Sequence, residues 1–299
     1  MGDETAIHDP DAVADRPDGP GRVTVACLQL NSGPDYEPNL RVVGDLARRA
    51  ADGGARLIAT PENVGVLATG RSRLLERAFP EPDHPGLAAL RDLARETGAW
   101  MIVGSLPVLV ETGRAASRCF LLTPEGKIAA RYDKMHMFDV DLPGGETYRE
   151  SATYRPGDAA VVAEAPWGAI GLSICYDLRF PHLYRDLAKT GAGILSIPSS
   201  FTEQTGRAHW HVLVRARAIE TGCFVLAPAQ VGRHDGNRRT YGHSLIVDPW
   251  GGVLADAGET VGVVTAELDL GRVAEARGAI AALGHDRPYA LPAAPARAT

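Results

Sequence analysis

Short apolar runs alternate with stretches of helical period from residue 22 onward, and Gly or Pro bounds most of them. This alternation limits the fold more than any other feature, because it is typical of α/β proteins in which helices cover a sheet. The predicted strands are 23–28, 57–60, 101–103, 194–197 and 224–227. The predicted helices are 39–51, 87–97, 181–190 and 208–220.

Three further pairs of apolar runs flank short turns and indicate antiparallel hairpins. They are 119–122 with 127–131, 160–165 with 169–175, and 244–247 with 253–255. Hairpins placed among α/β units predict a mixed sheet covered by helices. Core packing is the simpler interpretation of three aromatic residues, Phe201, Trp210 and Trp250, and we favour it for Trp250, which stands in the turn of the last hairpin.

The chain has 299 residues, of which 45% are hydrophobic, so it can bury a sizeable core. We predict an acidic flexible tail over residues 1–21, one main domain over 22–270 and a C-terminal arm over 271–299. Six of the first 20 residues are acidic and one is basic, so most of the formal net charge of -6 belongs to the tail. The main domain is therefore close to neutral, which does not favour a nucleic-acid partner.

Targeting and membrane signals are not recognisable in the sequence. The first residues lack the basic and apolar regions of a signal peptide. Every uncharged run is too short to span a bilayer. We therefore expect a cytoplasmic protein with no membrane partner.

The four cysteines, Cys27, Cys119, Cys175 and Cys223, lie far apart and form no C-x-x-C pair. Such spacing does not favour a zinc ribbon or a disulfide framework. The pair His209 and His211 is expected to be structural or exposed, because residues two apart on a helix face different directions. We therefore expect no metal and no cofactor, and the open question is which thiol is reactive.

Three predicted strands end in residue types that carry chemistry. Glu62 follows the run 57–60, Lys134 follows 128–131, and Cys175 follows 170–174. Ligands of open α/β sheets bind at the carboxyl ends of strands, so these side chains can converge. Glu62 can then accept the thiol proton of Cys175, and Lys134 can stabilise an oxyanion together with the backbone N–H that follows Cys175.

Taken alone, each of these residues has a simpler interpretation. A cysteine after an apolar run is more often a packing thiol than a nucleophile. A glutamate after a proline can begin a helix, and a lysine in a loop is usually a solvated charge. Only the combination points to a hydrolase.

With their neighbours, the three strand ends resemble the nitrilase superfamily of carbon-nitrogen hydrolases. The matching segments are Pro61-Glu62-Asn63, Tyr132-Asp133-Lys134-Met135-His136-Met137-Phe138-Asp139 and Ile174-Cys175-Tyr176-Asp177-Leu178-Arg179-Phe180-Pro181. The resemblance covers about residues 22–270. It implies a four-layer α-β-β-α sandwich and a homodimer or higher homo-oligomer.

The same resemblance implies a role for each of four site residues. Glu62 would be the general base, Lys134 the acid and oxyanion group, and Cys175 the nucleophile. Glu150 would be a second acid that holds Lys134 and the substrate in position. Tyr176, next to the nucleophile, is a further supporting candidate.

Within the superfamily, residues 198–221 and 241–251 are most similar to amidases that cleave deaminated glutathione to 2-oxoglutarate and cysteinylglycine. The resemblance thus implies a thioester-forming amidase with a small-molecule amide substrate. Omega-amidases acting on 2-oxoglutaramate share much of this region, whereas His211 departs from both. The candidate substrate-binding residues are Arg179, Ser200, Phe201 and Arg207. Either arginine can pair with a substrate carboxylate or form a surface salt bridge.

Three alternatives to this function remain open. Omega-amidase activity on 2-oxoglutaramate is the nearest. Hydrolysis of a nitrile or of an N-carbamoyl amino acid would use the same residues on a different bond. A scaffold or binding protein of the same fold would use none of them catalytically.

Overall fold

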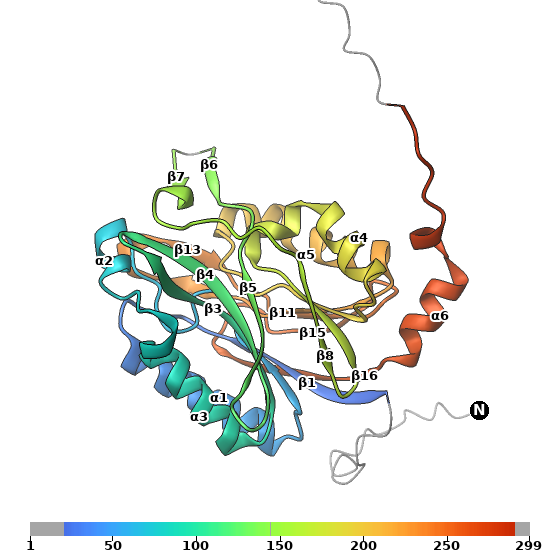
Figure 1. Cartoon of the computed structure of the whole chain (residues 1–299), viewed down its shortest axis with the longest axis horizontal. Helices are drawn as coiled ribbons and strands as arrows, with labels where there is room; N and C mark the ends of the chain where they lie inside the picture. Colours follow the sequence, from blue (N-terminus) through green and yellow to red (C-terminus); the bar gives the residue numbers. More distant parts are fainter. Residues whose placement is uncertain (1–20, 144, 291–299) are drawn as a thin grey trace, which may run out of the picture.

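A computed structural model describes residues 21–143 and 145–290 of the chain. Two six-stranded sheets pack against each other, and helices cover the outer face of each (Figure 1). The observed architecture is therefore the four-layer α-β-β-α sandwich that the family resemblance implied, and it contains the mixed sheets covered by helices that the residue patterns predicted.

The first sheet has the strand order β16-β1-β2-β3-β4-β5. Its strands are β1 (Arg22–Gln29), β2 (Leu57–Ala59), β3 (Trp100–Glu111), β4 (Arg114–Leu122), β5 (Ile128–Asp133) and β16 (Gly262–Asp269). The strands β1, β2 and β3 run parallel, β16 and β4 flank them antiparallel, and β5 pairs antiparallel with β4 and so runs in the direction of β1, β2 and β3.

The second sheet has the order β15-β14-β11-β10-β9-β8. Its strands are β8 (Val161–Ala165), β9 (Gly168–Leu172), β10 (Ile194–Ser196), β11 (Phe224–Ala227), β14 (Leu245–Val247) and β15 (Val253–Asp256). Here β9, β10 and β11 are parallel and the outer strands are antiparallel. Two small hairpins, β6 (Asp139–Asp141) with β7 (Thr147–Arg149) and β12 (Val231–Arg233) with β13 (Arg239–Tyr241), lie outside both sheets.

Alternate side chains of the first sheet explain how the layers form. Val25 and Cys27 of β1 face inward and pack with the second sheet. Ala26 and Leu28 face outward and pack under α1 (Tyr36–Asp52) and α3 (Pro85–Thr97). Because both faces are covered, the strands are continuous apolar runs without polar alternation.

The remaining helices cover the second sheet and extend the fold. The helices α4 (Pro181–Lys189) and α5 (Glu203–Thr221) contribute Leu183 and Trp210 to the core shared by the sheets. Helix α6 (Gly271–Ala279) lies in the predicted C-terminal arm and packs Val273 on the same core, whereas α2 (Arg71–Leu75) is short. No helix in the described part of the chain is long and apolar enough to cross a membrane.

Several predicted boundaries differ from the structure, and three of them have a clear local cause or bear on the site. The strand predicted at 101–103 continues to Glu111, because a register shift after Val103 accommodates Gly104 and the strand then resumes. The helix predicted from 208 begins at Glu203, where the hydroxyl of Thr202 caps it by accepting the N–H of Thr205. The strand predicted to reach 175 ends at Leu172. The predicted tail lies, apart from residue 21, outside the described residues.

Candidate active site

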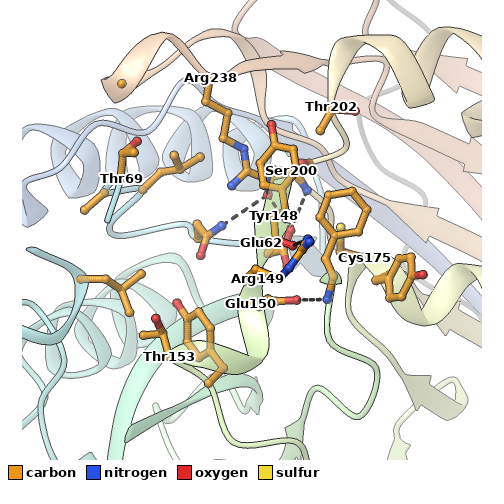
Figure 2. A pocket seen from close by; sticks show the side chains of 18 of the residues that line it. Glu62, Thr69, Tyr148, Arg149, Glu150, Thr153, Cys175, Ser200, Thr202 and Arg238 are labelled. Atoms are coloured by element: carbon orange, nitrogen blue, oxygen red, sulfur yellow. Dashed lines mark hydrogen bonds between the residues drawn. The ribbon is translucent and has the colours of Figure 1, made fainter. Parts of the chain in front are cut away.

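The three strand-end residues meet at one end of the paired sheets, where a fourth residue joins them. Lys134, just after β5, donates through Nζ to Glu62 Oε1 at 2.8 Å and to both oxygens of Glu150 at 2.8 Å. Glu62 follows β2, and Glu150 opens a 3-10 turn after β7. The side chains of Lys134 and Glu62 are only 1% and 4% exposed. The site therefore holds a buried ammonium between two carboxylates (Figure 2).

The charges of this cluster set its protonation. Burial would raise the pKa of Glu62, but Lys134, Ser200 and Arg238 together hold it below its ordinary value. Burial and the charge of Glu62 raise the pKa of Glu150. Burial opposes the charge on Lys134, yet the two carboxylates outweigh it and raise its pKa well above the ordinary value. Two carboxyls pushed apart in this way suit different roles, with Glu62 ionised and ready to accept a proton.

Cys175 begins the 3-10 helix η3 (Cys175–Arg179) with a φ of 50°, a left-handed backbone conformation that is uncommon for a non-glycine residue. Its own N–H is engaged with the carbonyl of Pro198 at 2.9 Å. Burial, and next the negative charge of Glu62, raise the pKa of the Cys175 thiol, so it rests protonated. A thiol in this state needs a base to become a nucleophile, and Glu62 is the adjacent carboxylate.

Asp177, two residues after Cys175, holds the turn that carries Cys175 in place. Its fully buried carboxylate accepts the backbone N–H of Ile174 at 2.8 Å and the hydroxyl of Tyr132 at 2.6 Å. His136 adds its backbone N–H at 3.1 Å and its ring Nδ1 at 2.7 Å. Asp177 thus joins the nucleophile turn of the second sheet to the segment of the first sheet that carries Lys134.

The second oxygen of Glu62 faces Ser200, after β10. Glu62 Oε2 accepts the Ser200 hydroxyl at 2.6 Å and the Ser200 N–H at 2.9 Å. The guanidinium of Arg238 donates to the carbonyl and hydroxyl oxygens of Ser200 at 2.8 and 2.9 Å. Figure 2 shows Arg238 reaching from the rim toward Ser200 and the ring of Tyr148. Ser200, which was expected to contact the substrate, is therefore hydrogen-bonded to Glu62.

A cavity of about 640 Å³ opens onto this cluster. Glu62, Lys134, Glu150 and Cys175 all line it. So do the predicted residues Tyr176, Arg179, Ser200 and Phe201. The guanidinium carbon of Arg179 lies 5.3 Å from the Phe201 ring centre and 5.9 Å from that of Tyr176. Arg207 is not among the lining residues and instead pairs with Glu203 on the exposed side of α5 at 3.0 Å.

Several side chains in and around the cavity were not predicted from the sequence. Arg238 adjoins the hairpin β12–β13 and Tyr148 belongs to the hairpin β6–β7, and the Arg238 guanidinium lies over the Tyr148 ring, 5.6 Å from its centre, in the cavity wall. These short hairpins have little apolar pattern that would predict them. Asp177 lies in the segment 174–181 that resembles the nitrilase superfamily, but its hydrogen bonds to the first sheet have no signal in the sequence. The expectation for Trp250 was wrong, because its turn directs the side chain outward and leaves the residue 60% exposed.

The histidine pair of α5 diverges as expected. His209 lies 3.3 Å from an Arg179 nitrogen, whereas His211 contacts Asp256. Among the described residues, the one group of three potential ligands whose atoms lie within 4.8 Å of one another is His211, His243 and Asp256, none of which lines the cavity.

The sequence over residues 24–278 matches the carbon-nitrogen hydrolase family. The chain is 40% identical over 266 residues to the deaminated glutathione amidase of Yersinia enterocolitica, covering 88% of this chain and 92% of that protein. It is 39% identical over 269 residues to the deaminated glutathione amidase of Homo sapiens, covering 88% and 82%.

A solved structure agrees. The NitFhit protein of C. elegans superposes with a TM-score of 0.84 at 35% identity, covering 90% of this chain and 66% of that longer chain. The chain therefore belongs to the carbon-nitrogen hydrolases of the nitrilase superfamily and is an amidase of that family.

Proposed function

We propose that Cys175 is the nucleophile of a thioester mechanism in which Glu62 is the base. As Sγ attacks the amide carbonyl, its proton passes to Glu62, and Lys134 stabilises the oxyanion. Collapse of the tetrahedral intermediate breaks the C–N bond, and the leaving amine takes the proton from Glu62. Glu62 then deprotonates a water that attacks the thioester, the C–S bond breaks to release the acid, and the proton on Glu62 returns to the Cys175 thiolate. The ammonium of Lys134 held at 2.8 Å from both carboxylates is the observation that carries this proposal.

Glu150 holds Lys134 in place in this scheme, and its Oε2 is itself fixed by the backbone N–H of Phe138 at 2.6 Å. Tyr176 supports the wall beside the nucleophile, because its ring packs edge-on against Phe138, with ring centres 5.1 Å apart. A reducing compartment such as the cytoplasm keeps Cys175 a thiol, as are all four cysteines here.

The proposed substrate is deaminated glutathione, cleaved to 2-oxoglutarate and cysteinylglycine. The names of the relatives point to it, and the cavity has room for a tripeptide-sized molecule. Both ends of that substrate carry carboxylates. Within the described part of the chain, Arg179 and Arg238 line the cavity without a carboxylate in ion-pair distance, so they are available to bind them. The much smaller 2-oxoglutaramate would leave much of the cavity unfilled.

A substrate panel tests the proposal on purified protein. It contains deaminated glutathione, 2-oxoglutaramate, succinamate, an N-carbamoyl amino acid and an aliphatic nitrile. The expected result is release of cysteinylglycine without ammonia, at the highest kcat/KM of the panel. Ammonia from 2-oxoglutaramate at a higher kcat/KM would instead identify an omega-amidase.

The nucleophile is tested separately. Cys175→Ser is expected to lose turnover, and mass spectrometry of quenched native enzyme should detect an acyl adduct on Cys175. The matched variant Cys119→Ser alters an equally buried thiol outside the cavity and should keep turnover. Turnover by Cys175→Ala would refute the assignment, and inactivity on the whole panel would favour a binding protein.

A homodimer is proposed as well. On the second helical layer, Ile219, Trp250 and Ile280 line one hollow and are 54%, 60% and 60% exposed, and Val212 lies two helical turns before Ile219. Exposed apolar groups that cluster in this way are typical of interfaces. Sedimentation should give a dimer for the native chain and a monomer for Ile219→Glu; a native monomer would contradict the proposal.

A further inference from the structure

Two histidines and an aspartate from three separate segments converge on the side of the molecule formed by α5 and the β14–β15 hairpin. His211 comes from the middle of α5, His243 from the segment after β13, and Asp256 from the end of β15. His211 Nε2 lies 3.1 Å from Asp256 Oδ2, and His243 Nδ1 lies 2.9 Å from Oδ1 and 3.1 Å from Oδ2 of the same carboxylate. The three ligand atoms lie within 4.8 Å of one another, and each side chain is partly open to solvent.

We infer that these three residues form a binding site for a divalent transition metal ion of the zinc type. Two imidazole nitrogens and one carboxylate oxygen are a ligand set that zinc adopts, with water in the remaining position. A zinc ion at about 2.0–2.2 Å from each ligand holds neighbouring ligand atoms of a tetrahedron about 3.4 Å apart. The two histidine–aspartate separations are already close to that spacing. Magnesium and calcium prefer oxygen ligands and fit the site poorly.

The backbone conformation of His243 fixes its ring beside Asp256. Its φ is 54°, in the left-handed region that non-glycine residues seldom adopt. Two hydrogen bonds stabilise this conformation. The N–H of His243 donates to the carbonyl of Gly258 at 2.8 Å, and the carbonyl of His243 accepts from Trp210 Nε1 at 2.7 Å. This conformation keeps the ring over Tyr241, with centres 4.5 Å apart, and its Nδ1 on Asp256. Strained residues of this kind cluster at ligand sites.

The groups around the three ligands match an outer shell. Asp256 Oδ1 accepts the N–H of Gly258 at 2.8 Å, so Oδ2 is the oxygen left for a metal. Glu259 Oε1 lies 4.0 Å from His243 Nε2, the nitrogen that points away from Asp256. A carboxylate behind a metal-binding imidazole is the usual arrangement, because it fixes the tautomer and raises the basicity of the ligand.

A metal here would link α5 to the β14–β15 hairpin, outside the catalytic cavity but connected to its wall through Trp210. Trp210 donates to the His243 carbonyl and packs on Phe201, with ring centres 4.9 Å apart. Phe201 lines the catalytic cavity. The site is thus structural, and its existence does not depend on the substrate or on the catalytic mechanism proposed above.

Zinc binding to untagged protein tests the site directly. Isothermal titration is done on a Cys175→Ser background, because a catalytic thiol can itself bind zinc. The expected result is one Zn²⁺ per chain, with the Kd raised at least about tenfold by His211→Gln and by His243→Asn. Glutamine keeps a donor to Asp256, and asparagine tolerates the left-handed backbone. His209→Gln, the same substitution two residues away on the same helix, is the matched control and should leave the Kd unchanged.

A thermal melt supplies an independent readout. Saturating Zn²⁺ should raise the Tm of the background protein and of His209→Gln, and should leave that of His211→Gln unchanged, because only a site in the folded state couples binding to stability. Absence of binding to the background protein would overturn the inference, as would equal zinc affinity in all of the variants. If His243→Asn fails to fold, His211→Gln on the partly exposed helix face decides the question alone.

Discussion

The hydroxyl of Ser200 gives the sharpest test of how the base is controlled. It donates to Glu62 Oε2 at 2.6 Å, and both residues are almost fully buried. A hydrogen bond to a charged group contributes about 1.5–3 kcal/mol. Removing it in Ser200→Ala disfavours the ionised form of Glu62. Because 1.36 kcal/mol corresponds to one pKa unit, the pKa of Glu62 should rise by about 1–2.

The assay is kcat/KM for cysteinylglycine release across about pH 4 to 9. The pKa of Glu62 is lowered in the native protein, so its charge is present above that value and is lost on acidification. In Ser200→Ala the acid limb should therefore move up by about 1–2 pH units, in step with the pKa. The control is Ser199→Ala, since the buried Ser199 hydroxyl donates to the carbonyl of Ile197 and not to Glu62. An unmoved limb in Ser200→Ala, or the same displacement in Ser199→Ala, would refute the reasoning.

Three further substitutions have defined outcomes. Glu150→Gln should lower kcat at least about tenfold, because Lys134 loses one of its two carboxylate partners, and should move the acid limb to lower pH, because the negative charge that repels Glu62 is removed. Arg238→Gln should raise the KM for deaminated glutathione about tenfold or more and the KM for an uncharged amide less. Arg239→Gln, which alters the exposed pair of Arg239 with Glu203, should leave both KM values unchanged. Gly104→Ala should lower the free energy of unfolding, measured in urea, by about 1–3 kcal/mol, because the added Cβ would lie 2.1 Å from the backbone carbonyl oxygen of Thr60. The control is Gly278→Ala, whose Cβ meets open space and should not destabilise the protein.

A mixed sheet covered by helices was predictable because its main signal is local, whereas the arrangement in four layers was implied only by the family resemblance. Strands buried on both faces are continuous apolar runs, and the covering helices repeat their apolar residues with helical period. Glu62, Lys134 and Cys175 could be singled out from the same signal, because each follows the carboxyl end of an apolar run. Their strands are not neighbours, since β2 and β5 belong to the first sheet and β9 to the second, and the packing of the two sheets brings these ends together. Glu150 was different: in the sequence it stands in a polar loop, and only the family resemblance singled it out.

The parts that could not be predicted depend on contacts between distant segments. Arg238 reaches the cavity because it donates to Ser200, a pairing that no local pattern encodes. Trp250 illustrates the opposite case, since a large aromatic side chain predicts burial but its turn faces outward. His211, His243 and Asp256 are far apart in sequence, so their convergence appears only when α5 packs beside the last hairpin.

Buried polar residues that bridge the two sheets explain why the catalytic side chains hold one geometry. Asp177, beside the nucleophile of the second sheet, accepts the hydroxyl of Tyr132 from the first. Gln230, which follows β11 of the second sheet, donates through Nε2 to the carbonyl of Glu62 at 2.9 Å. Each sheet thus fixes the backbone that carries the other sheet's catalytic group. Because an unpaired buried polar group is costly, a relative shift of the sheets would break these bonds together with the Glu62–Lys134 pair. Sheet packing and catalytic geometry are therefore one cooperative unit.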